Sequence, residues 1–149
     1  MLNNLNIFYK KKILIYGLGK SGLSAFKFLK KDNKIITHDD KKKPNNKKIS
    51  KIKFDYIIVS PGIDINRCSL SKFLKNNSKK IYTDLDIFYN NYKENNKITI
   101  TGTNGKSTTA KILYEVLKDQ KVDVRLVGNI GNPILLEKKI TDKTVFVIE

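Results

Sequence analysis

The chain has 149 residues, enough for one full domain or for one domain and part of another. Hydrophobic residues make up 40% of it, enough for a buried core, and no apolar run approaches the roughly 18 residues of a membrane helix. The net charge of +16 would normally suggest nucleic-acid binding, but Arg67 and Arg125 are the two arginines and the lysine clusters lack interleaved aromatic residues, so we expect a solvated basic surface and no nucleic-acid partner.

The chain begins with Met-Leu-Asn-Asn-Leu-Asn, in which no basic segment precedes an apolar one. This is not the layout of a secretory signal peptide, so we expect a cytoplasmic protein without membrane insertion. Cys68 is the single cysteine, which excludes an intrachain disulfide and is typical of a reducing compartment. No base is paired with Cys68 in the sequence, and we interpret it as an inert thiol.

The first predicted unit is a strand, a glycine turn and a helix. Residues 12–16 are a predicted buried strand, Gly17–Gly22 (Gly-Leu-Gly-Lys-Ser-Gly) follows at once, and residues 23–31 have helical spacing. A second strand, residues 34–38, ends in Asp39-Asp40, about 20 residues beyond the glycines, as in the dinucleotide-binding fingerprint. The glycines allow close approach of a phosphate, and the acid reaches a ribose. The pattern favours a nucleotide-type ligand in general rather than NAD in particular.

A lysine- and asparagine-rich segment comes next. Residues 41–53 surround Pro44 and predict a loop with little regular structure. The third strand, residues 54–59, ends at Ser60–Gly62, where a proline–glycine pair predicts a turn.

Short elements complete the first part of the chain. The pattern predicts a short helix over residues 69–74, a brief strand at 81–82 and a helix over 83–92. Residues 90–96 are polar and poor in apolar side chains, so they are the predicted linker.

The strongest chemical signal lies in residues 97–109, Lys-Ile-Thr-Ile-Thr-Gly-Thr-Asn-Gly-Lys-Ser-Thr-Thr. Residues 98–101 are β-branched and predict a short buried strand, and residues 106–118 have helical spacing. A glycine turn at such a junction lets backbone N–H groups approach phosphate oxygens, and the helix N-terminus adds positive potential. Lys106 would reach the β- and γ-phosphates, and the Ser107 hydroxyl would coordinate Mg²⁺.

The loop departs from the general phosphate-loop pattern in one respect. That pattern has a glycine five places before Gly105, where this chain has Ile100, so the predicted loop is shorter. The alternative is a strand–helix turn that merely contains two glycines. We favour the phosphate loop because the Gly-Lys-Ser triplet lies at the junction that the mechanism needs.

Two more strands follow the long helix. Residues 122–127 are a predicted strand, and Gly128–Pro133 (Gly-Asn-Ile-Gly-Asn-Pro) is a second glycine-rich turn. Residues 144–148 are a predicted buried strand that leads to Glu149. In a sheet that carries a phosphate loop, an acid at a strand end is where a Mg²⁺-binding carboxylate is expected. The alternative is an ordinary acid without a metal role.

Two other classes of protein stay open from the residues alone. One is an NAD-dependent oxidoreductase built on residues 17–39, which leaves residues 97–109 unexplained. The other is a nucleotide-binding or lysine-rich nucleic-acid-binding module without catalysis. We interpret His38 as structural, because it is a lone histidine at a strand end.

The motifs together resemble those of the Mur ligase family, most closely its D-glutamate-adding members. The phosphate-loop octapeptide Thr101–Thr108 is highly specific for the family and accounts for the short loop. The Ser-Pro-Gly turn in a Rossmann-like first domain favours the D-glutamate-adding members, and the alternative is a Mur ligase that adds a different amino acid. The matching residues span nearly the whole chain in the family's order: Gly17–Gly22, Ser60–Gly62, Thr83–Phe88, Thr101–Thr108, Gly128–Gly131 and Val147–Glu149.

The resemblance implies an α/β fold with two parts in this chain. Residues 1–93 would form a Rossmann-like, parallel-sheet domain that binds a UDP-sugar. Residues 94–149 would form the start of a P-loop ATPase α/β domain, an incomplete part of the central ATP-binding ligase domain. We therefore expect an N-terminal fragment without ligase activity of its own, less stable in its second half, from a protein that is monomeric at full length.

The implied reaction is ATP-dependent amide formation in peptidoglycan precursor synthesis. The carboxylate of UDP-N-acetylmuramoyl-L-alanine would attack the γ-phosphate of ATP, and the amine of D-glutamate would displace phosphate from the acyl phosphate. Lys106 is the expected catalytic residue, since its charge would stabilise the transferred group. The expected cofactors are ATP and Mg²⁺, with Ser107 and Glu149 as metal ligands.

The resemblance also assigns binding residues. The family often has a hydroxyl residue and then arginine after the first acid, where this chain has Asp40 and Lys41, and lysine lacks arginine's planar fork. This departure leaves the contacts to uracil open. The expected ATP-binding residues are Gly102, Thr103, Asn104, Gly105, Lys106, Ser107 and Thr108. The expected UDP-sugar-binding residues are Gly19, Lys20, Ser21, Gly22, Asp39, Asp40, Lys41, Ser60, Pro61, Gly62 and Asn129.

Overall fold

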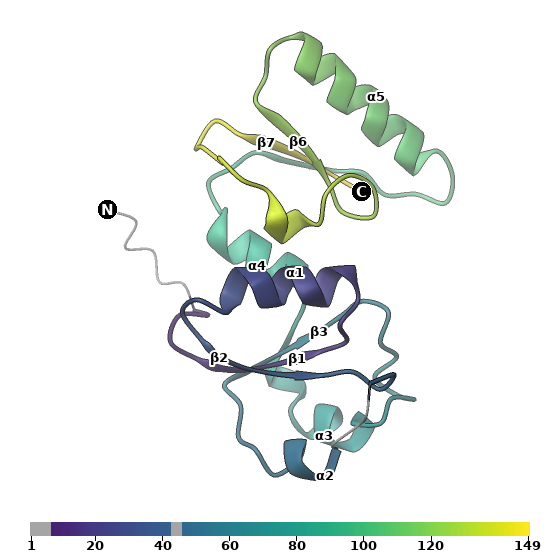
Figure 1. The fold of residues 1–149 in the computed structure, drawn as a ribbon. Coiled ribbons are helices and arrows are strands. Elements are labelled where there is room, and N and C mark those ends of the chain that lie inside the picture. Colours follow the sequence, from purple (N-terminus) through teal and green to yellow (C-terminus); the bar gives the residue numbers. More distant parts are fainter. Residues whose placement is uncertain (1–6, 43–45) are drawn as a thin grey trace. The chain divides into compact units, whose positions relative to one another are not determined.

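The chain divides into two compact units, residues 1–91 and residues 92–149, and Figure 1 traces both. The computed structural model describes residues 7–42 and 46–149. The N-terminal hexapeptide and the part of the predicted loop around Pro44 therefore lie outside the described residues. Each unit has a parallel sheet of its own, which confirms the expected α/β class.

A four-stranded sheet organises the first unit. Strands covered on both faces are apolar at nearly every position, and the strand at residues 12–16 is buried from Ile13 to Tyr16. All neighbours are parallel, in the order β2-β1-β3-β4. The strands are β1 (Lys12–Tyr16), β2 (Lys34–His38), β3 (Tyr56–Val59) and β4 (Ile81–Tyr82).

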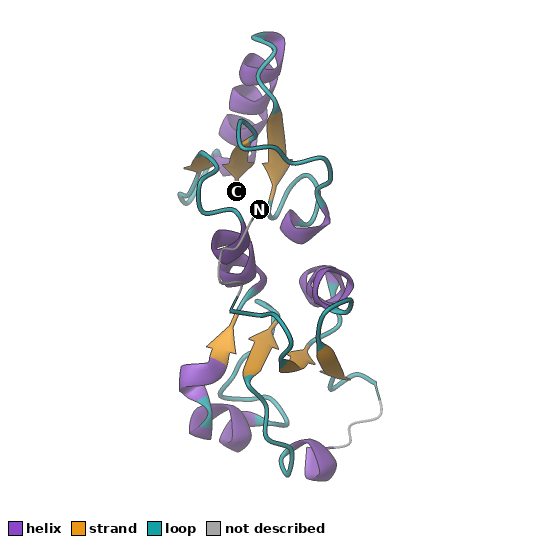
Figure 2. Cartoon of the chain, turned by 90° about the vertical axis from the view of Figure 1, so that its left-hand side faces the viewer, coloured by secondary structure: helices purple, strands orange, loops and turns teal. Residues whose placement is uncertain are grey.

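Helices cover both faces of this sheet, as Figures 1 and 2 show. One face carries α1 (Lys20–Leu29), with α4 (Asp84–Asn91) beside it, and the other carries α2 (Asn46–Ile49) and α3 (Ser71–Asn76), followed by the short 3₁₀ turn η1 (Ser78–Lys80). The apolar core between the sheet and the α2–α3 side consists of Leu14, Tyr16, Ile49, Phe54, Ile57, Val59, Leu70 and Leu74. This packing holds the carboxyl ends of β1, β2 and β3 side by side at one edge of the sheet.

Several element boundaries in the first unit differ from those predicted. The loop expected over residues 41–53 contains the helical turn α2, because Ile49 is apolar and packs into the core. The third strand begins at Tyr56 rather than at Phe54, although Phe54 is already buried. The helix expected from residue 69 begins at Ser71, since the Ser69 N–H bonds to a side chain distant in sequence.

The second unit has a three-stranded parallel sheet in the order β5-β7-β6. The strands are β5 (Lys97–Thr99), β6 (Val124–Val127) and β7 (Val145–Ile148), and the other elements are α5 (Lys106–Asp119) and the 3₁₀ turn η2 (Ile134–Leu136). One face of α5 packs on the sheet through Ala110, which lies in a cluster with Val124 and Val147. Residues 92–96 contain no helix or strand, so the predicted linker starts two residues too early.

The prediction that a buried strand precedes the phosphate loop is wrong. β5 is shorter than predicted and lies at the edge of the described sheet, where 38% of Ile98 is exposed. On α5, Ile112 and Val116 are also exposed, by 60% and 53%. β7, in contrast, is a central strand, and Phe146, Val147 and Ile148 are buried as predicted.

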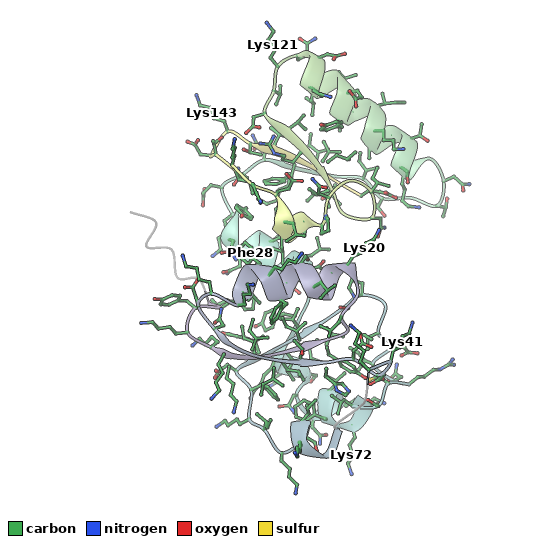
Figure 3. All side chains as sticks on the ribbon, in the orientation of Figure 1. Lys20, Phe28, Lys41, Lys72, Lys121 and Lys143 are labelled. Carbon is green, nitrogen blue, oxygen red and sulfur yellow. The ribbon has the colours of Figure 1, made fainter. Side chains whose placement is uncertain are left out.

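Lysine side chains project from the surfaces of both units, as Lys72, Lys121 and Lys143 do in Figure 3. All three are exposed, in agreement with the solvated basic surface inferred from the composition. Among residues 7–42 and 46–149, none of the helices has the length and apolar character needed to span a bilayer.

Candidate functional site

The expected UDP-sugar-binding residues of the first unit gather at the carboxyl ends of β1, β2 and β3. β1 lies between β2 and β3, so the chain connections leave it in opposite directions, and ligands of open α/β sheets bind at such a switch point. The Gly17 N–H donates to His38 O (2.8 Å), and the Ser60 N–H donates to Tyr16 O (2.9 Å). The glycine turn, the end of β2 and the Ser-Pro-Gly turn are therefore neighbours.

Close packing explains two of the glycines in the turn. A Cβ on Gly22 would lie 1.8 Å from Gly17 O and 2.8 Å from Ser60 Oγ, and Gly17 has a φ of +89°. The Ser60 hydroxyl donates to Gly17 O (2.8 Å), so it ties the two turns together. Gly19, by contrast, has no atom within 4 Å of an added Cβ and is exposed at the start of α1, open to a ligand.

The remaining expected residues at this edge are accessible. Lys20, Pro61, Gly62 and Lys41 are exposed, and Ser21 is half-buried in the first turn of α1. Backbone N–H groups at a helix start, next to exposed glycine, suit a phosphate oxygen. α1 has no acidic residue in its first turn, which would otherwise repel an anion.

Asp39 connects the end of β2 to the glycine turn. Its Oδ2 accepts the Leu18 N–H (2.7 Å), and its Oδ1 accepts the Lys41 N–H (2.9 Å). These two backbone hydrogen bonds, first that of Leu18, lower the pKa of Asp39 below its usual value. The carboxylate is thus ionised and half-buried at the position where the dinucleotide fingerprint has its ribose-binding acid.

Asp40 is the centre of a polar cluster. Its Oδ2 accepts the Tyr16 O–H (2.7 Å) and the Ser69 N–H (3.1 Å). Its Oδ1 accepts the Ser69 hydroxyl and lies 3.1 Å from His38 Nε2. Burial alone would raise the pKa of Asp40, but the hydrogen bonds, with those of Ser69 first, outweigh it and lower that pKa to about 2. The pKa of Tyr16 is raised above its usual value, and burial is the main cause.

Tyr16, His38 and Ser69 were not among the expected site residues. Tyr16 is fully buried and His38 is 4% exposed, so both lie beneath the surface at the carboxyl ends of β1 and β2. The interpretation of His38 as structural agrees with this position. The adjacent His-Asp-Asp at a strand end is the signal that could have indicated a cluster, but nothing local in the sequence connects it with Ser69.

In the second unit, a strand, a glycine turn and a helix form the predicted phosphate-loop arrangement. The loop from Gly102 to Gly105 is exposed, both glycines have positive φ (+148° and +73°), and α5 begins directly after Gly105. Positive φ is a conformation that glycine adopts readily. The Lys106 ammonium donates to Thr103 O (3.4 Å), so this side chain lies back over the loop. Thr108 is exposed in the first turn of the helix.

Ser107 and Glu149, 42 positions apart in sequence, meet at this loop. The Ser107 hydroxyl donates to Glu149 Oε1 (3.0 Å), while Glu149 Oε2 is buried and has no hydrogen-bond partner among the described residues. The meeting follows from the sheet order, since β7 lies next to β5 and the Ile100 N–H donates to Ile148 O (2.8 Å). A buried carboxylate oxygen without a donor is costly unless a cation or water satisfies it.

This donor set fits a magnesium ion bound together with a nucleotide. Mg²⁺ prefers oxygen ligands and usually takes one or two carboxylates, with phosphates and water supplying the rest. No group of three or more His, Cys, Asp or Glu side chains suited to a metal occurs within the described parts of the chain. Ser107 and Glu149 could therefore hold Mg²⁺ when phosphate oxygens are also present.

The second glycine turn lies against the same carboxylate residue. A Cβ on Gly128 would lie 2.3 Å from Glu149 O, and one on Gly131 would lie 2.1 Å from Leu126 O. The Asn129 N–H donates to Glu149 O (3.1 Å), and its side chain is exposed. Asn129, the expected UDP-sugar contact in this unit, is thus next to the Ser107–Glu149 pair along the edge of the sheet.

A polar network that has no local signal in the sequence supports this turn. Arg125 pairs with Asp123 and with Glu137 (Nε–Oε2 3.4 Å), and Glu137 accepts the Asn132 side-chain N–H (2.8 Å). Asp123 also accepts the Thr144 hydroxyl, which is the main cause of its lowered pKa. These contacts connect β6, the turn and the start of β7.

The fold and the site define an α/β protein with a glycine turn at the switch point of one sheet and a phosphate-loop arrangement beside an acid in the next. Residues 100–149 match the model of the Mur ligase middle domain. This match and the relatives described next agree with the resemblance to the Mur ligase family that the motifs indicate.

The relatives share one name, UDP-N-acetylmuramoylalanine–D-glutamate ligase. The chain is 35% identical to the protein of Rickettsia bellii, over 97% of the chain and 35% of the relative. It is 31% identical to that of Caldicellulosiruptor saccharolyticus, over 95% of the chain and 36% of the relative. It is 34% identical to that of Clostridioides difficile, over 84% of the chain and 32% of the relative. The chain therefore spans about a third of the length of these curated relatives.

Proposed function

We propose that this chain supplies the UDP-sugar-binding unit and the first part of the ATP-binding unit of a ligase that joins D-glutamate to UDP-N-acetylmuramoyl-L-alanine. The names of the relatives support this choice of substrates over those of other Mur ligases. The reaction belongs to peptidoglycan precursor synthesis, and its dependence on ATP agrees with a cytoplasmic protein. Residues 1–91 would hold the UDP-sugar, and residues 92–149 would begin the ATP site.

One observation carries the ATP assignment. The Ser107 hydroxyl and the Glu149 carboxylate meet at 3.0 Å beside an exposed glycine loop, and the second carboxylate oxygen has no donor among the described residues. A turn that merely contained glycines would not need an acid there. A phosphate-binding loop does, because the metal that accompanies ATP needs protein oxygens next to the phosphates.

Backbone and side-chain groups of the loop would both bind the phosphates of ATP. The backbone N–H groups of residues 102–108 would bind phosphate oxygens, and Lys106 would exchange its contact with Thr103 O for the β- and γ-phosphates. Bound Mg²⁺ would supply positive charge that offsets the charge on the phosphates, with Ser107 and Glu149 as its protein ligands.

The proposed chemistry is acyl transfer through a phosphate. An oxygen of the substrate carboxylate attacks the γ-phosphorus, the bond to ADP breaks, and an acyl phosphate forms. The free amine of D-glutamate then attacks the acyl carbon, loses a proton, and releases inorganic phosphate. Lys106 stabilises the negative charge of the transferred group in the first step, which is where a positioned cation accelerates phosphoryl transfer.

The first unit would bind the substrate through its switch-point edge. We propose that Gly19, Lys20, Ser21 and Gly22, with the turn Ser60–Gly62, bind the phosphate part, and that Asp39 and Lys41 lie at the nucleoside end. Asn129 of the second unit would contact the same substrate. The exposure of Gly19 and the ionised state of Asp39 support this assignment.

Thermal unfolding of the 149-residue protein tests the proposal. UDP-N-acetylmuramoyl-L-alanine and ATP–Mg²⁺, added separately, should each raise the unfolding midpoint by a few degrees, because a ligand at about 100 times its Kd adds about 2.7 kcal/mol. NAD should leave the midpoint unchanged. Stabilisation by NAD and not by the UDP-sugar would replace the proposal with the oxidoreductase alternative.

A further inference from the structure

We infer that Asp40 is a positioning residue that shapes the nucleotide-binding edge without touching the nucleotide. The inference rests on the proposed UDP-sugar function of the first unit and replaces the expected role of Asp40 as a direct contact. Its basis is the cluster of Tyr16, His38 and Ser69, whose side chains all converge on this one carboxylate.

The Asp40 carboxylate is surrounded by hydrogen-bonding groups of the protein itself, although 36% of its side chain is exposed. An ionised carboxylate offers about four acceptor sites. The Tyr16 O–H and the Ser69 N–H donate to Oδ2, the Ser69 O–H donates to Oδ1, and His38 Nε2 lies 3.1 Å from Oδ1. A ribose hydroxyl or a base N–H would have to compete with these groups for Asp40, and the groups also contact one another, since Ser69 Oγ lies 3.4 Å from the Tyr16 hydroxyl and 3.3 Å from His38 Nε2.

The four hydrogen bonds join three segments that are distant in sequence. Tyr16 ends β1, His38 ends β2, and Ser69 lies just before α3. Asp40 thereby holds the backbone that follows β2 in one conformation. Within that backbone, the Lys41 N–H reaches Asp39 Oδ1, and the Lys42 N–H reaches Asp39 O (3.0 Å).

The two adjacent acids therefore have different tasks. Asp39 accepts two backbone N–H groups, which leaves about half of its acceptor sites for a ligand. Asp39 and the exposed Lys41 can contact a nucleoside at this position, and Asp40 fixes the backbone that carries them. Loosening Asp40 should weaken nucleotide binding even though no contact is lost.

Titration calorimetry with UDP, at a temperature where every variant is folded, tests this relation. Asp40→Ala should weaken UDP binding about tenfold and Ser69→Ala about threefold, within the range of measured couplings between neighbouring residues. The double variant should bind no more weakly than Asp40→Ala, because both changes break the same support. Ser71→Ala is the matched control, since Ser71 bonds to Asn66 O and not to Asp40.

Other results overturn the inference. If Asp40 contacts the nucleotide directly, Ser69→Ala leaves the Kd for UDP unchanged, or its effect adds fully to that of Asp40→Ala. If Asp40 merely supports the fold, Asp40→Ala lowers the unfolding midpoint and leaves the Kd of the folded protein unchanged.

Hydrogen exchange separates this inference from the proposed function. In the absence of any ligand, Asp40→Ala should accelerate exchange of the Lys41 amide, because the backbone after β2 loses its anchor. Unchanged exchange at Lys41 would overturn the positioning role. Absence of UDP binding by the unmodified protein would overturn the UDP-sugar assignment, and the exchange result would still decide the role of Asp40.

Discussion

Lys106 is the residue on which we expect the proposed ATP site to depend most. Its ammonium is held near Thr103 O in the described structure and is the cation closest in sequence to the loop glycines. We expect Lys106→Ala to weaken ATP–Mg²⁺ binding by about 1.5–3 kcal/mol, the usual size of a charge-assisted hydrogen bond. Titration calorimetry of the 149-residue protein measures the change.

Lys111→Ala is the control for this prediction, because Lys111 is exposed on the same helix beyond the first turn. It removes the same charge from α5 without removing a cation from the loop. Equal affinities for ATP–Mg²⁺ in the Lys106 variant and the unmodified protein would remove the basis of the phosphate-loop assignment.

Asp40 makes the first unit sensitive to acid. Its folded pKa of about 2 is below the ordinary value of 3.8, so its contribution to stability is present above about pH 4 and is lost as the pH falls through 2. In Asp40→Asn this contribution is absent at every pH. We therefore expect the difference in unfolding midpoint between the two proteins to shrink from pH 5 to pH 2.

Circular dichroism melts at several pH values measure this difference. The net charge changes by one in the variant, and the measurements need constant ionic strength, since salt screens exposed charges. A difference between the two proteins that grows toward pH 2 would contradict the lowered pKa of Asp40.

At the scale of elements, the packing of α1 against the turn after β1 depends on Gly22. An alanine there would bring its Cβ within 1.8 Å of Gly17 O, which is backbone and cannot move away cheaply. We expect Gly22→Ala to lower the free energy of unfolding by about 1–3 kcal/mol, the range for overpacked sites. Chemical denaturation followed by circular dichroism measures this change.

Gly19→Ala is the matched comparison for the fold. Gly19 has a φ of −72° and nothing within 4 Å of an added Cβ, so alanine fits both the backbone and the space. Its free energy of unfolding should stay close to that of the unmodified protein. Equal destabilisation by the two substitutions would show that the contact with Gly17 O does not determine the effect.

At the scale of the whole molecule, the two units should differ in resistance to proteolysis. The first unit has helices on both faces of its sheet, whereas the second unit has α5 and the short 3₁₀ turn η2 beside its sheet. Parallel sheets are stable when both faces are covered. Lys93 is exposed in the segment without helix or strand that follows α4.

We expect brief treatment with trypsin to cleave after Lys93 and to leave a resistant product that contains the first unit. Lysines occur in both units, so survival of one unit reports on its structure rather than on the supply of cleavage sites. Mass spectrometry identifies the products. Protein unfolded in urea is the control and should be cleaved throughout, and earlier cleavage inside residues 12–38 would contradict the prediction.

Patterns local in the sequence were sufficient for most of the elements. β1, β2 and β4 have the predicted bounds, because apolar runs bounded by lysine or glycine carry their own strand preference. The start of α5 at Lys106 was also predictable, since two glycines precede it and helical spacing follows. Propensity and turn chemistry act over a few residues, so one segment at a time reveals them.

The sequence by itself therefore determined the α/β class, the phosphate-loop arrangement and the glycine turns. Only the tertiary structure decided that the Ser107 hydroxyl bonds to Glu149, that Ser69 reaches Asp40, and that β5 lies exposed at a sheet edge. Each of these depends on which strands become neighbours. Strand order is set by the burial of the whole chain rather than by any one segment, so contacts 29 or 42 positions apart leave no local pattern.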